Sequence, residues 1–511
     1  MIPRPKLRQW KSGRPDRYLE GDKSFKDNLI PSEGGFLGIK TDLEPGQIND
    51  KNFTNLKNCF IKDGIIQKCP GYEQYGVGFP LDGICWNVFE RRSYSGDREL
   101  FATTQKSLYK YNKNTFLWEY LSQNVFTGNE NEIINYDLTF SETEGEMISI
   151  FTNYKDNVKY QVLGKPVSDL FTHWKAKITK NYNHYQFYGN IYENGMHYPQ
   201  RFYWSTIGKP GIVTGSTEVG LYGGMMLAKS MGFITAFVPL RACFLIFKDD
   251  AMSVARWTGS AQVPFEIDEN IIDVGCPAGR TPDNVGEEVL FLGNDLNVYV
   301  TDGVSHKNVS KDVRKLLVER INKDKIERAF GRVILDDKWY MLFIPTIEKD
   351  WSYEVWILNF EDWTWQYFDY FNMLDLGFSY YSTLNKYENM FCDKDGYIYH
   401  SSNDFNRDKV AFESIIDTKD FWWNRDLYKK ATEIEIDCKG NGSLELWYSI
   451  DEGKTWTYKN SIILTSDWDI QSIKVDKICE KIRYRFRITG LDSYFYIRNY
   501  NPKRIDKGKI I

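Results

Sequence analysis

Residues 100–111 read LFATTQKSLYKY, and this stretch decides the class of fold. Two short runs of aliphatic and aromatic residues lie on either side of a polar link at Gln105 and Lys106. Alternation with a period of two buries one face of a strand, and a short polar link joins two such strands into a hairpin. The same shape returns at residues 289–300 (VLFLGNDLNVYV) and 391–399 (FCDKDGYIY). The chain is therefore predicted to consist largely of β-hairpins.

The hairpins recur at a regular spacing. The aromatic residues that open their turns are separated by 50, 96, 44, 52 and 48 residues, and 96 is twice 48: Phe101, Phe151, Phe247, Phe291, Phe343 and Phe391. A degenerate copy at residues 200–205 fills the double step, and an earlier copy begins at Phe60. Strand-only units with this period are typical of propeller blades. We therefore predict an all-β fold with a β-propeller of six to eight blades; a chance spacing in an aromatic-rich β protein is the alternative.

Three segments are expected along the chain. Residues 34–410 are predicted to form the propeller, with one inserted helix near residues 312–330 and Ser310 as its N-cap. Beyond residue 410 the strands are longer and the spacing no longer fits a blade. This change predicts a small C-terminal β-sandwich with a short tail over residues 425–511. Residues 1–33 are expected to form an extended basic N-terminal arm.

Composition excludes several classes of protein. The chain has 511 residues, of which 42% are hydrophobic and 26% charged, a balance that excludes a disordered chain. No run of 18 uncharged apolar residues is present, and no apolar segment follows the N-terminus, so neither a membrane span nor a secretory signal is expected. Synthesis in a cytoplasm is expected. The net charge of −5 argues against a protein that grips nucleic acid along its whole surface.

No catalytic, cofactor-binding or metal-binding residue is predicted. The eight cysteines include no C-x-x-C pair, and the five histidines are dispersed. The glycine-rich pieces lack the strand-then-helix context of a phosphate-binding loop. Cys59 and Cys69 flank a predicted turn at residues 63–64, which leaves a disulfide open, although buried thiols are favoured in a protein made in a cytoplasm.

One local motif has a clear structural meaning. Residues 449–456, SIDEGKTW, fit the pattern S-x-D-x-G-x-T-W, which resembles the Asp-box of sialidases and related propellers. In that motif Asp and Gly build a tight turn between two strands and the tryptophan packs beneath it. Asp-boxes lie away from sialidase active sites, so the resemblance implies a structural turn at Ser449, Asp451, Gly453, Thr455 and Trp456.

A glycan-degrading or carbohydrate-binding propeller, sialidase-like and used in receptor recognition, is the alternative function. Glycoside hydrolysis usually needs two carboxylates held ~5–10 Å apart. The adjacent pairs Asp249-Asp250, Asp336-Asp337 and Glu361-Asp362 do not fit, because neighbouring strand residues point to opposite faces, and we predict that they are turn residues. The tryptophans at 363, 365, 422 and 423 are predicted to pack within strands, although stacking on sugars is open.

The N-terminal arm combines prolines with positive charge. The first 28 residues contain eight Lys or Arg against four Asp or Glu, and Pro3, Pro5 and Pro15 favour an extended backbone. A single tryptophan cannot form a core. We predict that the arm reaches a neighbouring subunit or another protein. In this contact Trp10 is the aromatic anchor, and Arg4, Arg8 and Arg14 surround it. A solvated tail is the alternative.

Several motifs, taken in their order, resemble the propeller proteins of tailed bacteriophages. That family opens with a "GG" start, a "P-G-[EQ]" turn and a "dG-x-φ-x-[KR]-x-G" strand pair, and continues with aromatic "R-x-[FWY]-[FYW]-S" and "hLhhF-K" strands. It then has a blade of the form "G-[CT] … hhFL … [ST]-D-G", a helix after this blade and, in many members, a turn like that at residues 449–456 near the C-terminus. The matching positions are Gly34-Gly35, Pro45-Gly46-Gln47, Asp63-Gly64, Arg201–Ser205, Phe244–Lys248, Gly275-Cys276, Val289–Leu292 and Thr301-Asp302-Gly303. Cys69 stands where the family usually has a polar or basic side chain.

The resemblance implies a structural virion protein of the tail or head–tail junction, a packaged-DNA stabilisation protein or a tail-nozzle subunit. Such a protein is expected to form a ring, commonly of six copies, next to the portal and adaptor proteins. The ring would extend or close the channel through which double-stranded DNA passes without sequence-specific binding. Protected blade edges suit ring packing, and a mildly acidic surface lets a duplex slide.

Overall fold

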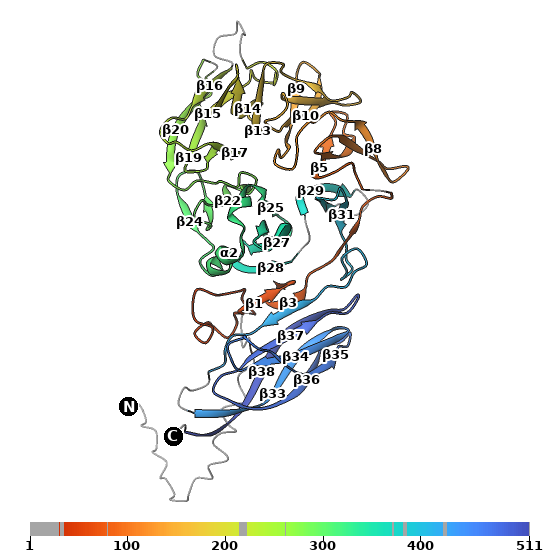
Figure 1. The fold of residues 1–511 in the computed structure, drawn as a ribbon, viewed down its shortest axis with the longest axis vertical. Coiled ribbons are helices and arrows are strands. Elements are labelled where there is room, and N and C mark those ends of the chain that lie inside the picture. The colour runs from red at the N-terminus through yellow and green to blue at the C-terminus, as the bar shows by residue number, and fades with distance from the viewer. Residues whose placement is uncertain are drawn as a thin grey trace, which may run out of the picture.

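The computed structural model describes residues 30, 35–78, 80–213, 222–260, 262–369, 373–381, 386–422 and 427–509. Over these residues the chain forms a ring of β-sheets joined to an elongated β-sandwich (Figure 1). The predicted all-β fold, with a propeller and a C-terminal sandwich, is confirmed.

Seven four-stranded blades surround one axis in the described part of the chain, within the predicted range of six to eight (Figure 1). Each of the first six blades is built from four consecutive strands, and the first strand of each lies nearest the axis. From the axis outward, blade 1 has β5 (Cys85–Arg92), β6 (Arg98–Thr104), β7 (Leu108–Asn112) and β8 (Leu117–Ser122), and blade 2 has β9 (Asn135–Ser141), β10 (Glu146–Thr152), β11 (Lys159–Val162) and β12 (Ser168–Asp169). Blade 3 has β13 (Trp174–Tyr182), β14 (Tyr185–Glu193), β15 (Met196–Trp204) and β16 (Gly223–Met226), and blade 4 has β17 (Ile234–Pro239), β18 (Phe244–Lys248), β19 (Met252–Trp257) and β20 (Phe265–Ile272). Blade 5 has β21 (Asp283–Val285), β22 (Glu288–Leu292), β23 (Val298–Thr301) and β24 (His306–Asn308), and blade 6 has β25 (Phe330–Ile334), β26 (Trp339–Thr346), β27 (Lys349–Asn359) and β28 (Thr364–Phe368).

The seventh blade closes the ring with a strand from the other end of the propeller sequence. Its first three strands are β29 (Met373–Tyr381), β30 (Lys386–Asp393) and β31 (Ile398–Ser401), and its outer strand is β4 (Tyr72–Gln74). β4 pairs antiparallel with β31 and precedes the first blade in the chain. Pairing therefore fastens the first and last blades together and covers the open edge of β31.

The sandwich is assembled from both ends of the chain. One sheet has the order β2 (Cys59–Lys62), β3 (Ile65–Lys68), β38 (Tyr494–Lys509), β33 (Leu427–Asn441) and β36 (Asp469–Cys479). The other has β1 (Asn55–Lys57), β32 (Ser414–Asp417), β37 (Arg483–Ile488), β34 (Ser443–Ser449) and β35 (Thr457–Ile463).

The N-terminal boundary of the propeller differs from the prediction of 34–410. Strands β1 to β3 lie in the sandwich, and the hairpin at Phe60, expected as an early blade copy, is the pair β2–β3. The reason is hydrophobic burial: Leu56, Cys59, Ile61 and Ile66 pack into the core shared with the C-terminal strands. A local hairpin pattern is the same in a blade and in a sandwich, so the sequence spacing alone assigned this hairpin wrongly.

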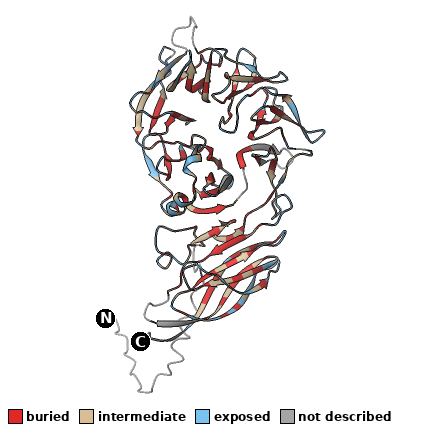
Figure 2. Ribbon diagram, viewed as in Figure 1, coloured by how far each residue is buried: buried red, intermediate tan, exposed pale blue. Residues whose placement is uncertain are grey.

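Blade 6 and the sandwich share one nine-stranded sheet. The outer strand β28 lies parallel to β1, with Tyr367 opposite Lys57, and β1 in turn pairs with β32. The hydrophobic core follows this sheet, since Trp356 of blade 6 belongs to the same cluster as Leu56 and Phe486 of the sandwich. Figure 2 shows buried residues along the strands of both parts. The two parts are therefore joined by backbone hydrogen bonds and by a common core.

The predicted spacing marks one particular strand of each blade. Phe101, Phe151, Phe247, Phe291, Phe343 and Phe391 all lie on the second strand of a blade and are buried. The degenerate copy at residues 200–205 falls mainly on β15, the third strand of blade 3. The second strand there is β14, with the buried Phe187 at the corresponding place. Blade 3 departs from the period, because Phe187 follows Phe151 by 36 residues and precedes Phe247 by 60.

The inserted helix is shorter than predicted. It is divided into α2 (Arg314–Arg320) and the 3-10 helix η1 (Lys323–Arg328). Ile321 ends α2 with an extended backbone and bridges Thr346 of β26. Ser310 does not cap the helix: its hydroxyl accepts a hydrogen bond from Val298 N at 2.8 Å, and Val313 holds the N-cap position. The backbone bridge between Ile321 and β26 therefore interrupts the single long helix that the apolar pattern predicted.

All eight cysteines are buried free thiols, as favoured from the sequence. Cys59 lies opposite Lys68 in the β2–β3 register, so Cys69 is not its partner across the hairpin. Burial raises the pKa of Cys69 to about 12, which keeps the thiol protonated at neutral pH.

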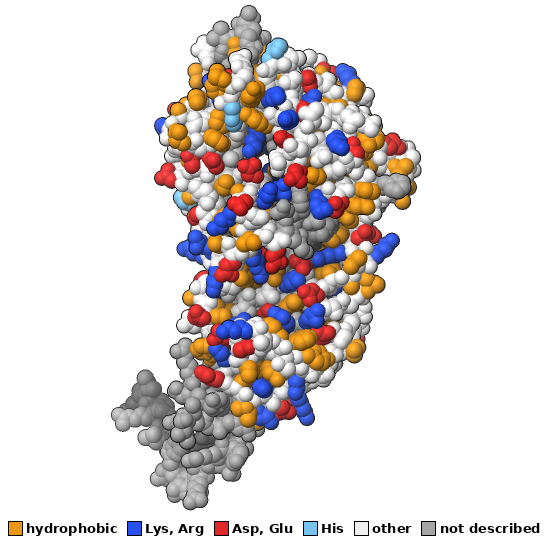
Figure 3. Space-filling view, in the orientation of Figure 1, with side chains coloured by type: hydrophobic (Ala, Val, Ile, Leu, Met, Phe, Trp, Pro, Cys, Tyr) orange, Lys and Arg blue, Asp and Glu red, His pale blue; other side chains and the backbone are white. Residues whose placement is uncertain are grey.

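The surface carries both signs of charge. On the face shown in Figure 3, Lys and Arg side chains are interspersed with Asp and Glu, and no large area of one sign is visible. Over the described residues, no helix is long and apolar enough to cross a lipid bilayer.

Candidate functional site

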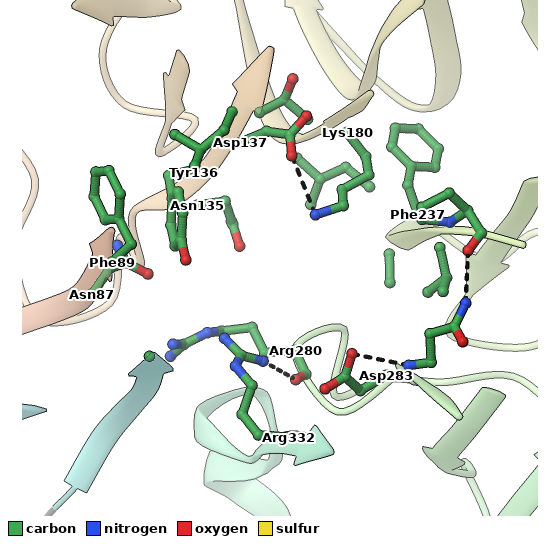
Figure 4. Close-up of a pocket in the computed structure, with 18 of the residues that line it drawn as sticks. Asn87, Phe89, Asn135, Tyr136, Asp137, Lys180, Phe237, Arg280, Asp283 and Arg332 are labelled. Atoms are coloured by element: carbon green, nitrogen blue, oxygen red, sulfur yellow. Dashed lines mark hydrogen bonds and ion pairs between the residues drawn. The ribbon is translucent and has the colours of Figure 1, made fainter. Parts of the chain in front are cut away.

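The propeller axis contains a cavity of about 820 Å³, here named the axial cavity (Figure 4). The first strand of every blade contributes to its wall, because these strands lie nearest the axis. The wall is rich in charge, with three carboxylates and five cationic side chains: Glu90, Asp137, Asp283, Arg92, Arg98, Lys180, Arg280 and Arg332.

Two of these arginines converge on a fully buried carboxylate, Asp375 of β29. Arg332 Nη2 lies 2.6 Å and Arg280 Nη2 3.3 Å from Asp375 Oδ1, and the Asp375 side chain is 0% exposed. Arg280 also donates to Leu374 O at 2.8 Å and Arg332 to Leu376 O at 3.2 Å. Burial opposes the charge of Arg332, but Asp375 and Asp283 outweigh it and raise its pKa. The cluster therefore joins blades 6 and 7 with the loop before blade 5.

The opposite wall carries a second ion pair (Figure 4). Lys180 Nζ lies 3.2 Å from Asp137 Oδ1, and Asp137 Oδ2 accepts from Gln186 Nε2 at 3.0 Å and from Asn181 N at 2.5 Å. Beside it the rings of Tyr136 and Phe89 stack with centroids 4.2 Å apart. Burial, and next the charge of Asp375, raise the pKa of Tyr136. These contacts join blade 2 to blades 1 and 3.

The remaining carboxylates of the wall also have partners. Asp283 accepts from Val333 N at 2.7 Å and from Asn284 N at 2.9 Å, and burial raises its pKa although Arg332 opposes the shift. Glu90 pairs with Arg98 at 2.6 Å. Each carboxylate of the described cavity wall is thus held by a cation or by backbone N–H groups. The arrangement is an electrostatic joint between blades.

Sequence reasoning missed this cluster. Arg280, Arg332 and Asp375 are distant in the chain and meet only because β25 and β29 adjoin at the axis. A usable signal was present in the run Met373-Leu374-Asp375-Leu376, where a carboxylate interrupts an apolar strand. Buried charges of this kind require a partner.

The carboxylate pairs considered for glycoside hydrolysis are turn residues, as predicted. Asp249 and Asp250 lie between β18 and β19, and they accept from Phe233 N at 2.6 Å and Gly232 N at 2.8 Å. The other two pairs lie in the turns between β25 and β26 and between β27 and β28. Trp365 is buried and donates to Val309 O at 2.8 Å, so it packs within the fold.

The motif at residues 449–456 forms a hydrogen-bonded turn between β34 and β35 of the sandwich. Asp451 accepts from Thr455 N at 2.9 Å and Thr455 Oγ1 at 2.5 Å, while Ser449 Oγ donates to Asp451 at 2.7 Å and accepts from Gly453 N at 2.8 Å. The hydrogen bonds from Thr455 hold the pKa of Asp451 well below its usual range. The Trp456 ring lies against the turn, since its Cζ2 is 3.5 Å from the position of a Cβ on Gly453. This half-buried ring lies under the Arg485 guanidinium, 3.9 Å from the centroid.

The candidate anchor of the arm, Trp10 with Arg4, Arg8 and Arg14, lies outside the described residues. The described chain begins at Ile30, which exchanges backbone hydrogen bonds with Tyr500 of β38 at 2.9 and 2.8 Å. Ile30 therefore lies at the edge of the sandwich sheet, beside β38.

Among the positions that carry the phage-protein resemblance, Gly35, Gly64 and Gly275 lie at close approaches between elements, whereas Phe244–Lys248 and Val289–Leu292 are blade strands. Gly35 and Gly64 have φ of +71° and +73°, and a Cβ on Gly35 would lie 2.3 Å from Gly64 Cα. A Cβ on Gly275 would lie 2.3 Å from the Asp249 backbone, and Cys276 N donates to Lys248 O at 2.7 Å. These close approaches give the glycines a packing role.

Within the described residues, no group of three or more His, Cys, Asp or Glu side chains is placed to hold a metal ion.

Comparisons with known proteins give a fold-level similarity. No protein-family model and no curated protein matches the sequence. Among solved structures, PorZ of the type-IX secretion system of Porphyromonas gingivalis is 12% identical with a TM-score of 0.37, and the match covers 76% of this chain and 46% of PorZ. YCF48 from Cyanidioschyzon merolae is 9% identical (TM-score 0.39; 65% and 98% covered). An exo-β-1,3-galactanase from Phanerochaete chrysosporium is 9% identical (TM-score 0.29; 85% and 100% covered). The chain spans about half the length of PorZ, and similarity at these levels assigns no activity.

Proposed function

We propose that this chain is a structural protein of a tailed-phage virion. It forms a ring, commonly of six copies, at the tail or head–tail junction, next to the portal and adaptor proteins. The ring extends or closes the DNA channel, helps retain packaged DNA and passes the duplex at ejection. The protein is synthesised in the host cytoplasm, resides in the virion and has no catalytic role.

The observation that carries the proposal is the nine-stranded sheet shared by blade 6 and the sandwich. Two domains on a flexible linker would change their relative orientation, whereas β1 pairs with β28 of blade 6 at Lys57 and Tyr367 and with β32 of the sandwich over residues 55–57. Closure of the propeller by β4 and the buried arginine cluster further stiffen the block. A rigid subunit with protected strand edges is suited to closed rings.

The resemblance supports the same proposal. Its glycines serve close backbone contacts, and its aromatic strands form blade cores, so the shared positions specify a building block. The interspersed charge in Figure 3 and the net charge of −5 suit a surface past which DNA slides.

The experiment combines the purified chain with the portal–adaptor complex encoded beside it. Sedimentation and negative-stain microscopy are expected to show six-fold rings attached to the adaptor. A chain that remains monomeric and fails to attach at any ratio of the two components would contradict the proposal.

A deletion of residues 2–29 tests the arm, and it keeps Ile30 because of its pairing with Tyr500. The truncated protein should retain its melting temperature and lose ring formation or adaptor binding. Trp10→Ala in the otherwise unchanged chain tests the anchor itself, and it should weaken assembly without lowering the melting temperature. Normal assembly of the truncated protein would show that the arm is a solvated tail.

A further inference from the structure

A second cavity, of about 370 Å³, lies at the other end of the propeller channel. Its wall combines the first halves of the inner strands β9, β13 and β17 and the loops before β9, β17 and β21 with side chains from the turn after β10, from β14 and β15 and from η1. The axial cavity extends further along the inner strands. The two cavities meet at Asn135, Ile178, Gly279 and Arg280. The volume lies within the range of ~300–1,000 Å³ typical of small-molecule sites.

Charged side chains of both signs line the second cavity in equal number, Lys177 and Arg280 against Glu132 and Glu327. Lys177 Nζ lies 3.5 Å from Glu327 Oε2, and both side chains are substantially exposed. Arg280 is paired with the buried Asp375, and Glu132 Oε2 accepts from Asn129 N at 2.8 Å. Because the charges of the wall sum to zero and each charged group has a partner, the cavity suits an uncharged molecule.

Aromatic rings form one side of the cavity. The Tyr154 and His197 rings lie 4.9 Å apart, and His197 and Phe233 lie 6.1 Å apart. Phe233 is 49% exposed and Tyr154 is half-buried, so ring surface is open to a ligand. The electron-rich face of such a ring attracts the weakly positive C–H groups of a sugar.

The backbone is strained at Tyr154, which has φ of +64°, in a region that bulky residues rarely adopt. Asn190 has φ of +59°, which an asparagine tolerates. Asn190 lies at an irregularity in the β14–β15 ladder, where the register shifts between Gly189 and Ile191. Strain of this kind persists at sites where a particular side-chain direction is needed.

The hydrogen bond between His197 and Asn190 fixes the tautomer of the His197 ring and so leaves Nδ1 as an acceptor. Asn190 Nδ2 donates to Ile234 O at 3.1 Å, so its Oδ1 faces His197 Nε2 at 2.6 Å and accepts from it. His197 Nδ1 then carries no proton in the neutral ring and can accept from a ligand hydroxyl. Burial, and next the charge of Lys177, lower the pKa of His197, which favours the neutral ring.

We infer that the second cavity binds an uncharged saccharide. One sugar face stacks on Tyr154 and Phe233, and hydroxyl groups bond to His197 and to the amide groups of the wall. The inference does not rest on ring assembly. The exposed aromatic rings of this cavity are the observation that favours a carbohydrate-binding role beside the structural one.

The test uses the full chain and saturation-transfer NMR with neutral sugars: glucose, galactose, mannose, N-acetylglucosamine, lactose, cellobiose, maltose and chitobiose. N-acetylneuraminic acid and adenosine serve as the charged and the nucleobase probes. At least one neutral sugar is expected to receive saturation and to titrate by calorimetry. Absence of binding by all neutral sugars at millimolar concentration, or preferential binding of adenosine or N-acetylneuraminic acid, would overturn the inference.

Two variants locate the binding. Phe233→Ala removes a half-exposed ring, and Tyr154→Asn keeps a residue that tolerates positive φ. Each should weaken the best sugar about tenfold or more at an unchanged melting temperature. Tyr94→Ala, which removes a 79% exposed ring outside the cavity, is the matched control and should bind normally. Unchanged affinity in both cavity variants would overturn the inference, whether or not ring assembly succeeds.

Discussion

The two ends of the propeller channel share part of the inner strands but are built differently. In the axial cavity Asp375 is fully buried between two arginines, and Phe89 stacks on Tyr136. In the second cavity the Lys177–Glu327 pair and Phe233 are open to solvent. Groups whose interactions are completed inside the protein stabilise the ring, whereas exposed groups retain capacity for a ligand. One end is therefore a joint and the other a candidate binding site.

The largest expected effect comes from removing the charge at the joint. Asp375→Asn leaves Arg280 and Arg332 without their buried counter-charge and should reduce stability by about 3–5 kcal/mol. Glu327→Gln, the matched change at the other end, breaks an exposed pair and should change stability by about 1 kcal/mol or less. Urea unfolding of both variants measures the difference. Equal losses of stability in the two variants would mean that the exposed Lys177–Glu327 pair stabilises the fold as much as the buried Asp375 cluster does.

The aromatic residues allow a second comparison with a smaller effect. Phe89→Leu removes a buried stacking partner of Tyr136 and should reduce stability by about 1–2 kcal/mol. Phe233→Leu, at a half-exposed position, should stay within about 0.5 kcal/mol of the parent protein. Thermal unfolding of the pair is the measurement. A larger loss for Phe233→Leu would place that ring in the structural core.

The sequence predicted the blades well because their signal is local. The six regularly spaced phenylalanines mark the second strands, since burial of one strand face imposes a period of two wherever a blade occurs. The same local signal placed the Phe60 hairpin in the propeller, because the pattern does not record which sheet a hairpin joins. Closure by β4 was not predicted either, since pairing with β31 depends on contacts across the whole propeller.

The candidate sites were harder to predict than the fold. Asp375 meets Arg280 and Arg332 only after the ring has closed, and no spacing along the chain connects them. Tyr154, His197 and Phe233 come from three different blades or the loops between them. The Ser449–Trp456 turn was predicted because all of its hydrogen bonds are local, but the exposure of Trp456 depends on Arg485 from another strand.

The Ser449–Trp456 turn gives a third comparison, because the hydrogen bonds that stabilise it lie within the turn. Trp456→Ala removes a half-buried ring and its contact with Arg485, so we expect a loss of about 1 kcal/mol. A fully buried tryptophan would cost ~3–5 kcal/mol. Thermal unfolding and sugar titration check this together: binding should be unchanged. Loss of sugar binding in a folded Trp456→Ala protein would give the turn a functional role.

The smallest expected effect is a pH dependence of sugar affinity at the second cavity. The pKa of His197 lies below its ordinary value of 6.5, so Nδ1 is an acceptor at neutral pH and becomes a charged donor as the pH falls through that lowered pKa. Sugar affinity should be constant above pH 6.5 and fall several-fold below it. Lys177, Glu327, Glu132 and Tyr154 also face the cavity, so His197→Gln is needed to assign the change. Calorimetric titration from pH 7.5 to pH 5 should show a flat profile for this variant; an acid decline that persisted in it would assign the change to the carboxylates instead.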